Sequence, residues 1–239
     1  MSRKPTLAVV GATGAVGTVM RGILSTRPDV WGEIRLVASA RSAGQTRDVR
    51  GVPVAVQELT ESVFDGVDVA MFDVPDEVSA QWGPVAAARG VVVVDNSGAF
   101  RMDDDVPLVV PEVNADQIAN RPRGIIANPN CAAITALVPL WPIHQKNRIK
   151  RVIISTYQAA SGAGAAAMDE LVESTRANLN GQVFTPKVMP HPYAFNLFNH
   201  PVFSNPGMNI NDSKAVNPNN IGNFGLITGT LAGTERRVQ

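Results

Sequence analysis

Cysteine is the rarest residue in this sequence, with one, Cys131, in 239 residues. A single cysteine excludes an intramolecular disulfide, a Cys-x-x-Cys redox pair and a multi-cysteine zinc site, and it fits a reducing compartment. An excess of charge is lacking too: 21 basic residues balance 21 acidic ones, so nothing favours nucleic acid or an anionic membrane as partner. The chain begins without the apolar core of a signal peptide, and no apolar run is long enough to span a bilayer. We therefore expect a cytoplasmic protein that acts on small molecules and binds no metal.

Short apolar runs of the kind that form buried parallel strands alternate with helical patterns in the first half of the chain. This alternation predicts an α/β fold, a Rossmann-like doubly wound parallel sheet with right-handed crossovers. Further along, a strong strand pattern precedes a helical one, which indicates a second, incomplete α+β domain. The expected strands are 7–10, 34–38, 67–72, 91–95, 125–127 and 152–158, and the expected helices are 16–24, 79–89 and 165–179.

Three glycines, Gly11, Gly14 and Gly17, follow the first strand and open the first helix, which is the context that a dinucleotide-binding motif requires. Glycines let the backbone approach a pyrophosphate, whose charge the helix N-terminus stabilises. The alternative is a glycine-rich turn that binds no ligand.

The end of the second strand distinguishes NAD from NADP, because NAD sites usually carry an acidic residue there. Here the sequence is Ser39-Ala40-Arg41-Ser42, with no acidic residue. A guanidinium and hydroxyls suit a 2′-phosphate, so the predicted cofactor is NADP. Arg41 as a solvated surface residue is the alternative.

Cys131 follows an Asn-Pro-Asn turn and precedes an Ala-rich apolar run. Pro129 disfavours helix in the residue before it and Asn130 is a favoured helix cap, so Cys131 is expected in the first turn of a helix. Unpaired N–H groups and the helix dipole stabilise a thiolate there, which predicts a catalytic nucleophile. A buried structural cysteine is the alternative.

Other segments are expected near this cysteine. Arg101 follows a strand end, the edge at which open α/β sheets bind ligands, and could hold a phosphate. Gln158 offers an amide to orient a carbonyl, and Ser161-Gly162 lies in a loop small enough for a nicotinamide ring to approach. Taken singly, Arg101 could be a surface ion pair and Gln158 a capping amide. Together they suggest acyl transfer coupled to hydride transfer.

At this point the sequence resembles the aspartate-semialdehyde dehydrogenase family. The resemblance runs in order from residue 5 to about residue 200, and the cysteine motif together with the Gln158 segment is highly specific to that family. The matching segments are Gly11-Ala-Thr-Gly-Ala-Val-Gly17, Asp95-Asn-Ser-Gly-Ala-Phe-Arg101, Val109-Val-Pro-Glu-Val-Asn114, Asn128-Pro-Asn-Cys131, Ser155-Thr-Tyr-Gln-Ala-Ala-Ser-Gly-Ala-Gly164 and His191-Pro-Tyr-Ala-Phe-Asn196.

The resemblance implies NADP-dependent interconversion of aspartyl phosphate and aspartate semialdehyde through a Cys131 thioester, in lysine, threonine and methionine biosynthesis. It implies that Asn130 and nearby N–H groups stabilise the oxyanion, that Arg101 binds phosphate and that Gln158 orients the acyl intermediate. It also implies a homodimer or homotetramer. The implied cofactor-binding residues are Gly11, Thr13, Gly14, Ala15, Val16, Gly17, Ser39, Arg41, Ser42, Ser161 and Gly162.

The last part of the chain departs from the family pattern. The family's later Gly-His base and its substrate-binding Arg, Glu and Lys have no match, and none of His144, His191 and His200 stands in the base position. We expect an NADP-binding domain over 1–130, a partial catalytic and dimerisation domain over 131–205 and an irregular Asn-rich tail over 206–239. From a shortened chain without a base we expect activity at least about a hundredfold below that of an intact enzyme. Two other hypotheses remain, an inactive NADP-binding or interaction protein and a reductase of another acyl phosphate.

Overall fold

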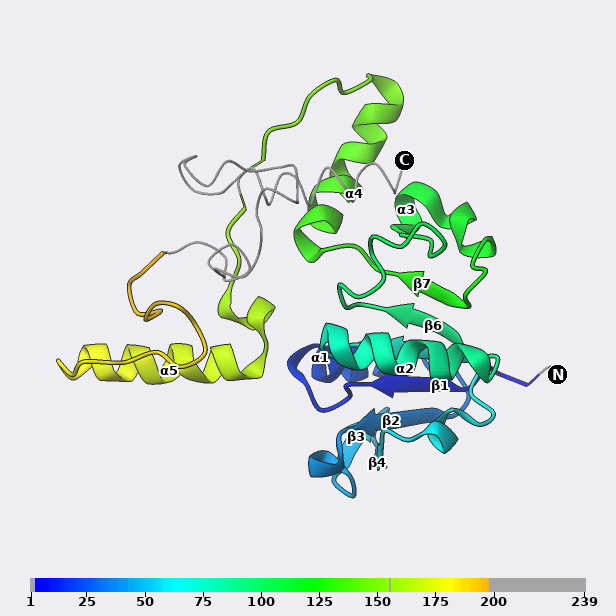
Figure 1. Ribbon diagram of the computed structural model, residues 1–239, viewed down its shortest axis with the longest axis horizontal. Coiled ribbons are helices and arrows are strands. Elements are labelled where there is room, and N and C mark those ends of the chain that lie inside the picture. The colour runs from blue at the N-terminus through cyan, green and yellow to red at the C-terminus, as the bar shows by residue number, and fades with distance from the viewer. Residues whose placement is uncertain (1–2, 155, 198–239) are drawn as a thin grey trace. The chain divides into compact units, whose positions relative to one another are not determined.

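The computed structural model describes residues 3–154 and 156–197, which separate into two compact units (Figure 1). The first unit runs to Arg148 and the second begins at Ile149. Residues 198–239, with His200 and the predicted Asn-rich tail, lie outside the described residues.

The first unit is built on a seven-stranded sheet of order β3-β4-β2-β1-β5-β6-β7 (Figure 1). Neighbouring strands pair in parallel, except that β3 pairs with β4 in the antiparallel direction. The predicted Rossmann-like α/β fold is therefore confirmed. The strands are β1 Leu7–Val10, β2 Ile34–Ala38, β3 Thr46–Val49, β4 Val52–Glu58, β5 Val69–Phe72, β6 Val92–Asp95 and β7 Ile125–Ala127.

Helices cover both faces of this sheet, and β1 shows why. All four of its residues are fully buried, and they alternate between two core clusters. Leu7 and Val9 pack in the cluster that includes Leu24, whereas Ala8 and Val10 pack in the cluster that includes Ala86. A strand with apolar residues on both faces needs cover on both faces, which α1 and α2 provide (Figure 1). The helices of this unit are α1 Ala15–Ser25, α2 Asp76–Ala88, α3 Pro111–Asn114 and α4 Cys131–Lys146, with 3₁₀ turns η1 Ala40–Ser42, η2 Glu61–Phe64 and η3 Ala115–Ala119.

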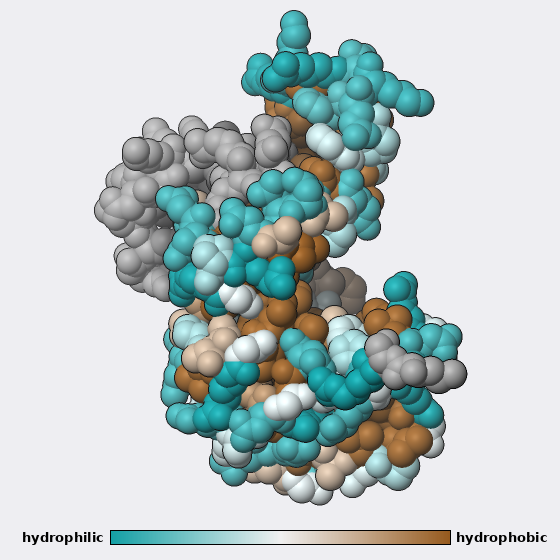
Figure 2. Space-filling view, turned by 90° about the vertical axis from the view of Figure 1, so that its right-hand side faces the viewer, coloured by the Kyte–Doolittle hydropathy of each residue, from teal (hydrophilic) through white to brown (hydrophobic). Residues whose placement is uncertain are grey.

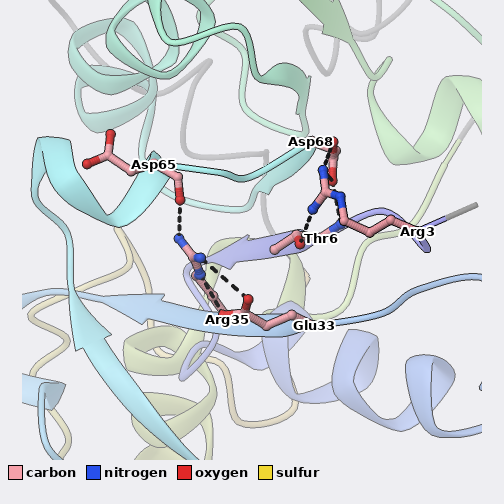
Figure 3. A network of polar contacts seen from close by, with 6 residues as sticks. All are labelled: Arg3, Thr6, Glu33, Arg35, Asp65 and Asp68. Carbon is pink, nitrogen blue, oxygen red and sulfur yellow. Dashed lines mark hydrogen bonds and ion pairs between the residues drawn. The ribbon is translucent and has the colours of Figure 1, made fainter.

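Ion pairs hold the chain at the amino ends of β1, β2 and β5, the edge opposite the predicted site (Figure 3). Arg3 donates to both carboxylate oxygens of Asp68, at 2.8 and 3.0 Å. Arg35 binds Glu33 at 2.7 Å and donates to the backbone oxygen of Asp65, also at 2.7 Å. Exposed pairs of this kind contribute about 0–1 kcal/mol each to the free energy of unfolding. They therefore hold the first residues of these strands in place but do not determine the fold.

Helix α4 determines where the first unit ends. The predicted boundary lies between residues 130 and 131, ahead of this helix. Ile134, Leu137 and Val138 of α4 instead pack against the buried core beneath it. The first unit accordingly continues through α4 to Arg148, and Cys131 lies in the same unit as the glycine loop.

The described part of the second unit consists of η4 Ala160–Ala163, α5 Ala165–Leu179 and irregular segments. The predicted strand 152–158 is not found, since residues 152–154 and 156–158 are irregular. A strand needs a neighbour to accept its hydrogen bonds, and the described residues of this unit supply none.

Glu170 organises the second unit. Its carboxylate accepts backbone N–H bonds from Lys187, Val188 and Met189 at 2.6, 2.7 and 2.9 Å, while Ser174 accepts one from Ala194 at 3.2 Å. Burial raises the pKa of Glu170, but the three N–H bonds outweigh it, so the net shift of the pKa is downward. The carboxylate therefore holds residues 187–189 on α5.

The visible surface is mixed in character. In the space-filling view, apolar residues form patches between hydrophilic ones (Figure 2). Among the described residues no helix combines the length and apolar character needed to cross a membrane. Nor do the described histidine, cysteine, aspartate and glutamate side chains form a cluster of three or more that could hold a metal.

Candidate active site

The glycine loop joins β1 to α1 with no room for side chains at two of its three glycines. Gly11 has φ +93°, and a Cβ there would lie 2.0 Å from the backbone oxygen of Asp73. A Cβ on Gly17 would lie 2.3 Å from the oxygen of Gly11. At Gly14 the nearest atom would be 3.3 Å away. Gly11 and Gly17 are thus needed for close packing of strand, loop and helix.

The N-terminus of α1 is suited to an anion. Gly14 is the N-cap and provides no side-chain cap, and the first turn has no acidic residue. The first helical bond runs from Thr18 N to Gly14 O at 3.0 Å, so the N–H groups of Ala15, Val16 and Gly17 come before it. Such N–H groups, together with the positive end of the helix dipole, are a usual phosphate site.

The segment after β2 meets this loop. The hydroxyl of Thr13 donates to that of Ser42 at 3.4 Å, and Ser42 is buried in η1. Ser39 is the N-cap of η1, and Arg41 within it is exposed. The structure thus brings together the loop and the strand end that the sequence singled out.

Cys131 is the first residue of α4 and is exposed, which contradicts the alternative of a buried structural cysteine. Asn130 is the N-cap, and its Oδ1 accepts a hydrogen bond from Ala132 N at 2.9 Å. This bond fixes the amide, so that Nδ2 is the end of Asn130 that remains to donate to another group. Proline and asparagine therefore place the cysteine as predicted.

Arg101 lies beside the cysteine turn. Its Nε donates to the backbone oxygen of Asn128 at 2.9 Å and its Nη2 to that of Asn96 at 2.8 Å. Burial lowers the pKa of Arg101, while the charges of Asp76, Asp95 and Cys131 act to raise it. The guanidinium is therefore bound to the turn that leads into the cysteine, and it is held by backbone carbonyls rather than by a surface ion pair.

A chain of side chains crosses the carboxyl ends of β5, β6 and β7. Asn96 Nδ2 donates to Asp73 Oδ1 at 2.9 Å, and Asn128 Nδ2 donates to Asn96 Oδ1 at 2.6 Å. Since a carboxylate only accepts, Asp73 determines the direction of both amides. The residue after β5 and the cysteine turn are thereby joined at the carboxyl edge of the sheet.

Gln158, Ser161 and Gly162 lie together in the second unit. A Cβ on Gly162 would be 2.1 Å from Nε2 of Gln158, so the glutamine side chain lies directly over the glycine of η4. Gly164 follows with φ +88° and is the N-cap of α5. The three predicted residues are thus neighbours within their own unit.

His144 does not provide a base at the start of α4. His144 stacks on Trp141, with ring centroids 5.9 Å apart, near the end of the helix that Cys131 begins. Thirteen residues of helix span about 20 Å, far beyond hydrogen-bond reach. His191 belongs to the second unit.

Sequence reasoning missed the acidic residues around Arg101. Asp76 Oδ1 accepts from Gly98 N at 2.7 Å, and Asp95 is completely buried behind the same turn. Their position in the sequence could have indicated them, because Asp73 follows one strand and Asp95 ends the next, both at the edge of the sheet where ligands bind. Their partners are far apart in sequence and could not be read from it.

Comparison with known proteins gives a consistent result. The family described as "Semialdehyde dehydrogenase, NAD binding domain" matches residues 6–121, and "Semialdehyde dehydrogenase, dimerisation domain" matches residues 140–218. The aspartate-semialdehyde dehydrogenase of Synechocystis sp. is 44% identical over 194 residues, which are 81% of this chain and 57% of the relative. That of Aquifex aeolicus is 45% identical over 215 residues, 88% of this chain and 63% of the relative.

Solved structures agree with the sequence comparison. A crystal structure of aspartate semialdehyde dehydrogenase II from Vibrio cholerae, complexed with ASA, is 44% identical with a TM-score of 0.80. The match covers 83% of this chain and 60% of that one. This chain therefore spans less than two thirds of the length of these relatives.

Proposed function

The chain belongs to the semialdehyde dehydrogenase family, and the relatives compared above are aspartate-semialdehyde dehydrogenases. We propose that it catalyses the aspartate-semialdehyde dehydrogenase reaction. The reaction interconverts aspartate semialdehyde plus phosphate with aspartyl phosphate, and it belongs to lysine, threonine and methionine synthesis. The observation that carries the proposal is an exposed cysteine at a helix start, with the guanidinium of Arg101 bound to the backbone oxygen of Asn128 in the turn before it.

The first unit contains the family's nicotinamide-cofactor domain. The glycine loop fits the pyrophosphate, since the N-cap Gly14 leaves the first N–H groups of α1 without a side-chain cap. We propose NADP rather than NAD, because Arg41 is exposed next to Ser42 and the segment from Ser39 to Ser42 has no acidic residue. When bound, the cofactor supplies a hydride acceptor or donor at the reacting carbon.

Cys131 forms the covalent bond. In the oxidative direction its sulfur attacks the aldehyde carbon, and loss of a hydride from that carbon leaves a thioester. The α4 N–H groups and Nδ2 of Asn130 stabilise the oxygen that becomes negative. Arg101 holds phosphate, whose attack on the thioester releases the acyl phosphate and returns the thiolate.

The family resemblance also suggests roles for Gln158, Ser161 and Gly162, which belong to the second unit. The amide of Gln158 orients the acyl group, and the small loop at Ser161 and Gly162 admits the nicotinamide ring. A dimer or tetramer in the cytoplasm fits the matched dimerisation domain and the single cysteine.

The test is an assay of the 239-residue chain for NADP- and phosphate-dependent oxidation of aspartate semialdehyde. Cys131→Ser should abolish turnover while NADP affinity stays within about twofold, since the thiolate is the nucleophile. The wild-type rate also tests the expectation of weak activity in the shorter chain. Turnover that survives loss of the cysteine would refute the proposed chemistry, and cofactor binding without turnover in the wild type would favour a binding protein. Preference for another semialdehyde would favour a different acyl-phosphate reductase.

A further inference from the structure

Asp95, at the carboxyl end of β6, is a fully buried carboxylate that accepts hydrogen bonds from hydroxyl and N–H groups. Ser79 of α2 donates its hydroxyl to Oδ1, and Ser97 donates its hydroxyl to Oδ2 at 2.7 Å. The backbone N–H of Ser97 also points to Oδ1 at 3.3 Å. A buried carboxylate is unfavourable unless it accepts hydrogen bonds. An apolar residue in place of Asp95 would leave these donors without an acceptor.

The bonds to Asp95 shape the turn that carries Arg101. The hydroxyl of Ser97, which donates to Asp95, also accepts a hydrogen bond from Ala99 N at 3.1 Å. Gly98 N donates to Asp76 at 2.7 Å, and a Cβ on Gly98 would lie 2.8 Å from that carboxylate. The turn therefore sits between two carboxylates, one on each side.

Arg101 follows this turn directly. Its N–H donates to Gly98 O at 3.3 Å, and its guanidinium donates to the backbone oxygens of Asn96 and Asn128. Among the described residues, none accepts a hydrogen bond from Nη1 of Arg101. The carbonyls thus fix the inner side of the guanidinium and leave the other side for an anion. Asp76 and Asp95 also act to raise the pKa of Arg101 against the effect of burial.

We infer that Asp95 is a positioning residue for anion binding: through Ser97 it fixes the 96–101 turn, and so directs the guanidinium of Arg101 at the phosphate. This rests on the proposed function, which gives Arg101 that ligand. Asp95 itself is buried and does not touch phosphate. Its replacement should weaken phosphate binding selectively, because the cofactor loop depends on other contacts.

The experiment measures the affinity of the 239-residue chain for inorganic phosphate and, separately, for NADP, by calorimetric titration. Asp95→Asn keeps the size of the side chain but replaces an acceptor oxygen with a donor. It should weaken phosphate binding about tenfold or more and change the NADP affinity less than twofold. Asp65→Asn is the matched control, since Asp65 is an exposed carboxylate paired with Arg89, and it should change neither.

Ser97→Ala provides a second route to the same contact. It removes one hydroxyl and should also lower phosphate affinity, even where Asp95→Asn fails to fold. In the double variant the two losses should add only in part, because both variants disturb the bond between the Ser97 hydroxyl and Asp95. Additive losses, or an equal loss of phosphate and NADP affinity, would show a general structural role and overturn the inference.

The inference and the proposed function fail in different ways. Phosphate binding that needs Arg101, tested with Arg101→Ala, but is unchanged in Asp95→Asn and Ser97→Ala overturns the positioning role alone. A wild-type chain that binds no phosphate, or binds it equally without Arg101, removes the anion site and both ideas with it.

Discussion

Gly17 and Gly22 lie on the same helix, and the same substitution should affect them in opposite directions. A Cβ on Gly17 would lie 2.3 Å from Gly11 O and 2.8 Å from two backbone atoms of Ala12. These atoms belong to the backbone of the loop and cannot move aside as a flexible side chain would. A Cβ on Gly22 meets nothing within 4 Å.

The magnitudes follow from these distances. Overpacking typically costs about 1–3 kcal/mol, and alanine is more favourable than glycine in a helix by about 0.5–1 kcal/mol. Gly17→Ala should therefore lower the free energy of unfolding by about 1–2 kcal/mol, near the difference of the two effects. Gly22→Ala should raise it by about 0.5–1 kcal/mol.

Urea denaturation of both variants measures the stability change, and an NADP titration measures the effect on the loop. Gly17→Ala should bind NADP about tenfold more weakly, a change of about 1.4 kcal/mol, because the loop must shift to admit the methyl group. Gly22→Ala should bind it as the wild type does. A Gly17→Ala protein as stable as the wild type, with unchanged NADP affinity, would refute the close-packing argument.

Three further outcomes are expected. Arg41→Ala should weaken NADP binding by about 1–3 kcal/mol and leave NAD binding nearly unchanged, and equal losses for the two cofactors in parallel titrations would argue against a 2′-phosphate contact. Iodoacetamide should modify Cys131 in the folded chain with one label per molecule, as mass spectrometry would show; labelling only after unfolding would contradict its exposure. The folded pKa of Glu170 is lowered from 4.5, so its stabilisation is present above the unfolded pKa and is lost as pH falls through the folded one. The protection factors of the amides of residues 187–189 against hydrogen exchange should fall in that acidic range. In Glu170→Gln they should be low already at neutral pH. Protection factors that do not change with pH would contradict this expectation.

Much of the first unit could be predicted because its signals are local. Strands β1, β2 and β7 have the predicted bounds, since each is a short run of mainly apolar residues in the parallel part of the sheet. Helix α5 also matches, because glycine at 164 ends the preceding loop and frees the backbone to begin a helix. The cysteine turn was predictable for the same reason, from Pro129 and Asn130.

Features that depend on distant partners could not be predicted. The β3–β4 hairpin was missed because β3, with the sequence Thr-Arg-Asp-Val, lacks an apolar alternation and because its turn places Arg50 at φ +59° before Gly51. The expected strand 152–158 has the composition of a strand but no neighbour among the described residues. Asp95 and Ser79 are 16 residues apart, and their contact exists only when α2 lies on β6.

The single cysteine also makes this chain suitable for site-specific labelling. Maleimide dyes, spin labels or crosslinkers added to this chain have one cysteine to find, and it is exposed at the start of α4. A probe can therefore be attached there without removing other cysteines, beside the Asn96–Asn128 bridge and Arg101. Its fluorescence or mobility would register ligands that arrive at this edge of the sheet in real time, even when no product is formed.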